Sequence, residues 1–247
     1  MRRIALFIWM LLACLSEISG QKSYALLVGV SNYQEDALNL ASPKDDAKKM
    51  YDVLGQDPQF VRSIIQNRYA SKKTVLEELS KIAKAASGKD CIVFFFAGHG
   101  ENGYLIMADN KKVYYSDLIK LLKKTDARHV YCFIDACHSG SIKQQLYRSD
   151  SLLIKSGINF VMACREDQYA TESSWIGHGY FSQALIKGLK GYADKNKNGQ
   201  ITLCELYKYV LTDVTKRAKS ENVQQTPQLI ASKKSLNTVI IHYNKNK

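Results

Sequence analysis

Two apolar runs in this chain end in short polar turns that could together carry out chemistry. The segment FIDACHSG (residues 133–140) contains Cys137, and the segment FFFAGHG (residues 94–100) contains His99. A thiolate can attack a carbonyl carbon, an imidazole can give the leaving group a proton, and backbone amides can hold the oxyanion that forms. Cys137 is the candidate nucleophile and His99 the candidate base. Gly100 has no Cβ, so its amide could approach a substrate closely.

The choice of His99 rests on what precedes each histidine. A second G-H-G triplet surrounds His178, but it leads into the amphipathic segment YFSQALIKGL and is more typical of a loop or a helix start. His138 is adjacent to Cys137 and, in an extended chain, would point to the opposite side. We therefore expect His138 to steady the turn rather than serve as the base.

The elements that must position these turns alternate between strand and helix. Unbroken apolar runs such as CIVFFF predict strands covered on both faces. Apolar residues at helical spacing predict the helices, and Ser42 followed by Pro43 is a typical helix start. The predicted strands are 23–30, 61–66, 91–96, 104–107, 130–134 and 158–163, with extended segments near 228 and at 238–242. One predicted helix begins at residue 43. The others span residues 71–86, 116–124, 180–189 and 202–219.

This alternation predicts an α/β fold with a mostly parallel central sheet and helices on both faces. Active sites of such sheets form just beyond the carboxyl ends of the strands. Both polar turns follow a predicted strand, so we expect Cys137 and His99 to meet at one edge of the sheet.

These motifs resemble those of the caspase-like cysteine peptidases, and most closely the metacaspase and bacterial caspase-like branch. FFFAGHG and FIDACHSG carry the resemblance; YALLVGVSNY, PKDDA, HGYFSQAL and QTPQL support it. The resemblance implies a caspase-like sandwich and hydrolysis of peptide bonds by a Cys137–His99 dyad, with Gly100 contributing to the oxyanion hole. The alternative is a caspase-like scaffold or binding protein without catalysis.

The resemblance also predicts the substrate. Asp135 stands where caspases carry a glutamine, in the pocket for the residue before the cut, and Asp46 within PKDDA resembles a second acidic position. Carboxylates there would attract Arg or Lys by charge-assisted contacts. Alternatively, Asp135 is a structural turn acid, and Asp46 complements the positive end of a helix.

A calcium site is the less favoured interpretation of a third motif. Asp194, Asn196, Asn198 and Glu205 match the pattern of a calcium loop. However, the two lysines between them repel a cation, and no second copy of the loop follows. We expect a structural turn and no cofactor. The segment GSIKQQLYRSDSLLIKSG (residues 140–157) is where caspases are cut into subunits, so self-cleavage there is a further hypothesis.

The beginning of the chain predicts export. Two arginines, an apolar run and the small residues Ser19 and Gly20 form the pattern of a signal peptide, which we place at residues 1–20. One peptidase domain, 21–247, then remains, in the periplasm, at the cell surface or outside the cell. The apolar run is too short for an integral membrane span. The less favoured alternative to cleavage after Gly20 is lipid attachment at Cys14, because LLAC resembles a lipoprotein box.

Charge and cysteine content do not favour nucleic-acid, zinc or disulfide chemistry, so the expected partners are those that the resemblance implies, protein or peptide substrates; contact with a cell surface or an anionic polymer stays open. The net charge is +12, but the lysines are scattered rather than interleaved with aromatic residues, so we expect no nucleic-acid binding. The six cysteines show no C-x-x-C spacing, which favours neither a zinc site nor a disulfide framework. Cys91 and Cys132 lie in predicted strands and are expected to be inert core residues.

Overall fold

The central element of the fold is a six-stranded sheet. The computed structural model describes residues 20–143, 157–170 and 179–243. The strand order is β10-β8-β7-β3-β1-β2, and every pair is parallel except the antiparallel pair of β10 and β8. The strands are β1 (Ser23–Gly29), β2 (Phe60–Gln66), β3 (Cys91–Ala97), β7 (His129–Asp135), β8 (Ile158–Met162) and β10 (Gln228–Ile230).

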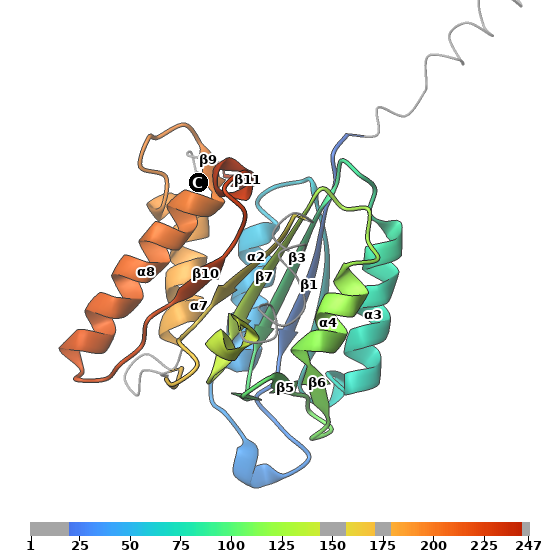
Figure 1. Cartoon of the computed structure of the whole chain (residues 1–247), viewed down its shortest axis with the longest axis vertical. Coiled ribbons are helices and arrows are strands. Elements are labelled where there is room, and N and C mark those ends of the chain that lie inside the picture. Colours follow the sequence, from blue (N-terminus) through green and yellow to red (C-terminus); the bar gives the residue numbers. More distant parts are fainter. Residues whose placement is uncertain (1–19, 144–156, 171–178, 244–247) are drawn as a thin grey trace, which may run out of the picture.

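Helices cover both faces of this sheet, as predicted (Figure 1). On one face lie α3 (Lys72–Ala85) and α4 (Tyr115–Leu122). On the other lie α2 (Pro43–Leu54), α7 (Tyr180–Lys187) and α8 (Leu203–Ser220). The alternating order of strands and helices predicted this layering, because a crossover between parallel strands must pass over a face of the sheet.

The two faces of the sheet form two hydrophobic cores. Phe94 and Phe96 pack with the α3 and α4 side, whereas Phe95 packs with the α2, α7 and α8 side. All seven residues of β3 are therefore buried. Burial on both faces is the reason that this strand is an unbroken apolar run rather than an alternating one. Cys91 and Cys132 are buried and free, as predicted.

Two small sheets were not predicted. One consists of β4 (Gly100–Glu101), β5 (Tyr104–Ile106) and β6 (Lys112–Tyr114), and the other pairs β9 (Gln200–Thr202) with β11 (Val239–His242). Of these strands, only β5 and β11 were expected as extended segments. The others have two or three residues each, which is too short to show an alternating pattern. Within the described ranges, no helix has the length and apolarity needed to cross a membrane.

Helix α2 packs closely on the end of β1 because Gly29 lacks a side chain. A Cβ at Gly29 would lie 2.7 Å from the Cβ of Ala47 and would also collide with the carbonyl oxygen of Pro43. Ser42 is the N-cap residue of α2, but its side chain forms no capping hydrogen bond. The contact with Gly29 therefore fixes the start of α2, and with it the position of Asp46 in the first turn.

We predict that Gly29→Ala lowers the free energy of unfolding by about 1–3 kcal/mol, because the added methyl group overpacks this contact. Gly88→Ala is the matched control, since its Cβ would meet only the Asp126 carbonyl oxygen, at 3.7 Å. Urea denaturation of the two variants measures the difference. Equal stability of Gly29→Ala and the wild type would contradict the packing described for α2.

Candidate active site

The register of β3 and β7 brings the two polar turns together. Ala97 pairs with Asp135, and the amide of Gly98 donates to the carbonyl oxygen of Asp135 at 3.1 Å. Both strands run in the same direction, so the residues that follow them emerge at the same edge of the sheet. His99 and Cys137 consequently line one pocket, with a volume of about 70 Å³. The sequence predicted this meeting.

His99 is held by the loop between β1 and α2. No role was assigned to this loop from the sequence. Its Nε2 lies 2.8 Å from the carbonyl oxygen of Leu38, and its backbone amide donates to the Tyr33 hydroxyl at 2.7 Å. The Tyr33 ring packs against the imidazole, with 5.1 Å between centroids. Because a carbonyl oxygen can only accept, Nε2 must carry the hydrogen, and Nδ1 is left as the basic nitrogen.

The same loop is fixed by asparagine side chains. Asn67 Oδ1 accepts from the amides of Ser31 and Asn32, and Asn39 Oδ1 accepts from the amide of Tyr33. Asn67 has a φ of 49°, a left-handed conformation that asparagine tolerates better than most residues. These contacts set the loop that orients the histidine. The motif YALLVGVSNY contains Tyr33 and was the available signal for its role.

Cys137 lies in the turn after β7 and is partly buried. Its Sγ is 3.9 Å from the carbonyl oxygen of Ala170. Burial raises the pKa of the Cys137 thiol, and the negative charges of Asp135 and Glu101 raise it further. The thiol is therefore protonated at neutral pH until a base takes its proton.

The turn around Cys137 depends on two neighbours. His138 has a φ of 52°, and its Nδ1 lies 2.7 Å from the carbonyl oxygen of Glu166. Its ring also packs edge-on against Tyr169, at 4.9 Å. His138 thus steadies the turn, as predicted. A Cβ on Gly100 would lie 2.8 Å from the Cβ of Ala136 and 3.0 Å from the carbonyl oxygen of Cys137, so only glycine allows this packing.

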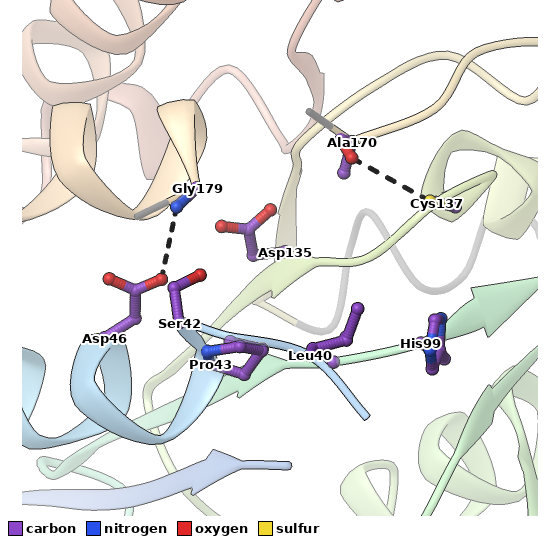
Figure 2. Close-up of a pocket in the computed structure, with 11 residues that line it drawn as sticks. Leu40, Ser42, Pro43, Asp46, His99, Asp135, Cys137, Ala170 and Gly179 are labelled. Carbon is purple, nitrogen blue, oxygen red and sulfur yellow. Dashed lines mark hydrogen bonds between the residues drawn. The ribbon is translucent and has the colours of Figure 1, made fainter. Parts of the chain in front are cut away.

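The two predicted pocket acids line the same pocket as His99 and Cys137 (Figure 2). Asp46 is 1% exposed and Asp135 is 8% exposed. Asp46 Oδ2 accepts from the amide of Gly179 at 3.4 Å, and Asp135 Oδ2 accepts from the amide and hydroxyl of Ser182 at 3.1 and 2.6 Å. Both buried carboxylates are thus hydrogen-bonded, as buried charges generally are, and both bring acidic groups to the pocket.

Gly179, at the start of α7, makes this acidic pocket possible. A Cβ there would lie 2.6 Å from Oδ2 of Asp135. The glycine was recognised within the motif HGYFSQAL but was assigned no role. The neighbouring His178, the alternative histidine, lies outside the described residues. So do Cys14 and most of the segment considered for self-cleavage.

The residues of the calcium motif form a hydrogen-bonded turn. Both carboxylate oxygens of Asp194 accept backbone amides, from Asn198 and Gly199, and the Tyr243 hydroxyl also donates to Oδ2. Burial raises the pKa of Asp194, but these hydrogen bonds outweigh it and the net pKa is lowered. Glu205 accepts from Asn196 and caps α8 together with Thr202.

This donor set does not fit calcium. The carboxylates of Asp194 and Glu205 are occupied by the chain's own donors, and only these two bring negative charge. Across the described ranges, no group of three or more His, Cys, Asp or Glu side chains is placed to hold a metal ion.

Comparison with known proteins identifies the family. The model of the caspase domain matches residues 22–237. The chain belongs to the caspase domain family. A crystal structure of a protein from Geobacter sulfurreducens superposes with a TM-score of 0.66 at 17% identity, over 90% of this chain and 99% of that one. No curated protein matches. This caspase domain therefore belongs to a family of cysteine peptidases, whose substrates are proteins.

The raised pKa of Cys137 predicts how the resting caspase domain reacts. Alkylation of Cys137 by iodoacetamide should rise with pH to a midpoint above that of an unperturbed thiol, because the thiol stays protonated to higher pH. Glu101→Gln should lower this midpoint, since it removes a charge that opposes the thiolate. Peptide mass spectrometry separates Cys137 from the partly exposed Cys204.

The control for this measurement is Glu77→Gln. Glu77 is an exposed acid on α3 that pairs with Lys73 and is not among the charges that act on Cys137. It should leave the midpoint unchanged. A wild-type midpoint at or below that of a free thiol, or no change in Glu101→Gln, would contradict the electrostatics described here.

Proposed function

We propose that the chain is an exported cysteine endopeptidase that cuts after Arg or Lys. One observation supports this most directly: Asp46 and Asp135 line the same pocket as His99 and Cys137. A basic side chain bound between the acids would place the carbonyl carbon of its own residue at the sulfur. The guanidinium or ammonium group would bring a positive charge and further donors to the two carboxylates.

The proposed reaction uses His99 first as a base and then as an acid. His99 Nδ1 takes the proton of the Cys137 thiol, and the thiolate attacks the carbonyl carbon of the scissile bond. The amides of Cys137 and Gly100 are the proposed donors to the oxyanion. As the carbon–nitrogen bond breaks, the imidazolium gives its proton to the leaving amine. A water molecule, activated by His99, then hydrolyses the thioester and releases the acid.

The acidic pocket also couples substrate binding to activation. Asp135 raises the pKa of the Cys137 thiol in the free protein. A bound cation would offset that charge and lower the pKa of the Cys137 thiol, so the thiolate would form more readily once Arg or Lys occupies the pocket. An acidic side chain would have the opposite effect and would also be repelled. The same carboxylate thus serves both recognition and restraint of the nucleophile.

Export is the second part of the proposal. The arginines, apolar run and small residues of 1–20 support a signal peptide, and the catalytic domain would begin at Gln21. In the described structure, Gln21 precedes β1 and donates to Cys91 Sγ at 3.5 Å, at the edge of the sheet opposite the pocket. The mass of the N-terminal peptide of the mature protein tests this cleavage.

A panel of peptides that differ only in the residue before the cut tests the preference. We expect cleavage after Arg and Lys and none after Asp. Cys137→Ala should abolish turnover, and Asp135→Asn and Asp46→Asn should each lower kcat/KM for Arg peptides by about 10–100-fold, the size expected when one partner of a desolvated charged contact is lost.

The control is Asp52→Asn, because Asp52 lies on the same helix as Asp46 but is exposed and paired with Lys48. It should cleave like the wild type. Cleavage after Asp but not after Arg would overturn the proposed preference. Absence of cleavage across the panel, with a folded protein, would favour the alternative of a non-catalytic scaffold.

A further inference from the structure

The small sheet β4-β5-β6 presents a polar, aromatic face beside the candidate active site. Leu105 and Val113 are fully buried, so the residues that alternate with them face outward. Tyr104 pairs with Tyr114 across β5 and β6, and Ile106 pairs with Lys112. On the outward face, Lys112, Tyr114 and Glu101 are exposed, whereas Tyr104 and Ile106 are partly buried.

A lysine ammonium group lies over the ring of each of the two tyrosines. Lys112 Nζ lies 4.4 Å from the centroid of Tyr104, and Lys72 Nζ lies 6.0 Å from the centroid of Tyr114. The two rings pack edge to face, with centroids 5.7 Å apart. Cation–π contacts of this kind hold long, flexible side chains in place at little cost. We call these four residues, Lys72, Tyr104, Lys112 and Tyr114, the Tyr–Lys platform.

Two acids lie near the platform: Glu101 is opposite Tyr104 in the small sheet, and Asp109 accepts from the backbone amide of Lys72 at 3.1 Å, but neither is paired with a platform ammonium. Neither ammonium forms a salt bridge with a described residue, and the neighbouring Asp109 is paired with Lys111 at 3.7 Å. Beside the platform, Arg68 covers the ring of Tyr69, which is 63% exposed. Two held but unpaired ammonium groups form a surface that is complementary to an acidic ligand.

The platform is continuous with the cleft. β4 begins at Gly100, directly after His99, and the amide of Gly103 donates to Ser141 Oγ in the buried turn that follows Cys137. Glu101 pairs with Tyr104, and its charge acts on the Cys137 thiol. The small sheet therefore connects the nucleophile to the platform within a few residues.

The direction of a bound substrate places its downstream half on this side. Asp46 and Asp135 lie on one side of the pocket, and His99 and Cys137 lie on the other (Figure 2). A basic side chain held by the acids fixes the residue before the cut. The leaving amine must then lie beside His99, which protonates it. The chain beyond that amine would then continue along β4, which follows His99, toward the platform.

We propose that the Tyr–Lys platform binds an acidic segment of the protein substrate a few residues downstream of the cut. This inference rests on the proposed function. A peptide fits better than a glycan or a nucleic acid, because the lysines cover ring faces that sugars or bases would need for stacking. Glu101 adds a second feature: it repels acids next to the cut, so the acidic segment must lie farther on.

Two matched quenched-fluorescent peptides test the platform. They share the same residues around an Arg cut site and differ only in a downstream run of glutamates or glutamines. We expect the wild type to cleave the glutamate peptide with a kcat/KM about three- to tenfold higher at low salt, the size expected for two exposed charge pairs. The difference should shrink as added salt shortens the Debye length.

The test variant is Lys72→Gln combined with Lys112→Gln, which should lose the preference while cleaving a short peptide without a tail like the wild type. The control is Lys208→Gln combined with Lys216→Gln, which makes the same charge change on exposed positions of α8 and should keep the preference. An unchanged preference in the test variant, or none in the wild type, would overturn the proposal.

Binding to Cys137→Ala separates this proposal from the proposed function. Fluorescence anisotropy of the glutamate tail alone, titrated with Cys137→Ala, needs no cleavage. If no peptide is cut but the tail binds through Lys72 and Lys112, acidic-peptide binding by the platform is supported and the proposed peptidase activity fails. If cleavage after Arg occurs but the tail does not bind, the platform fails. Stronger binding of a sulfated polysaccharide than of the tail would also overturn it.

Discussion

The parallel pairing of β3 with β7 is the constraint on which the candidate site depends. The register pairs Ala97 with Asp135, so the turns that follow β3 and β7 leave the sheet side by side. The hydrogen bond from the Gly98 amide to the Asp135 carbonyl oxygen holds the two turns together. His99 and Cys137 come from positions far apart in the chain, so only this pairing can bring them to one pocket. Burial of both strands on two faces makes a slip of the register costly, because every side chain would change faces.

Around this pairing, the site is built from backbone groups and close glycine contacts. The Leu38 carbonyl fixes the tautomer of His99, the Tyr33 hydroxyl holds its amide, and Gly100 and Gly179 let the Cys137 turn and the Asp135 carboxylate approach closely. Asp135 opposes formation of the Cys137 thiolate, and under the proposed function it also binds the basic side chain of the substrate. In the proposed enzyme, a basic substrate resolves this conflict by neutralising the acid that restrains the nucleophile.

Much of this arrangement could be predicted from the sequence, because the apolar strand runs are long and each ends in a distinctive polar turn. His99 and Cys137 could be expected in one pocket because each follows a predicted strand of one parallel sheet. The contribution of Leu38 could not be predicted, since a backbone carbonyl leaves no trace in residue type. The placement of Asp46 depends on the tertiary contact of α2 with Gly29, and β6 is too short for a periodic signal. The lysine pairing on Tyr104 and Tyr114 likewise appears only once the small sheet is folded.

The central claim is that Cys137 and His99 act together on a carbonyl group whose side chain is held by buried acids. The most direct measurement is covalent labelling of the mature protein with an arginine-based chloromethyl ketone, followed by peptide mass spectrometry. We predict one adduct, on Cys137, that forms faster than the adduct of a matched norleucine reagent and that is strongly slowed in His99→Ala. Labelling of Cys204 instead, or equal rates with both reagents and in His99→Ala, would contradict the account.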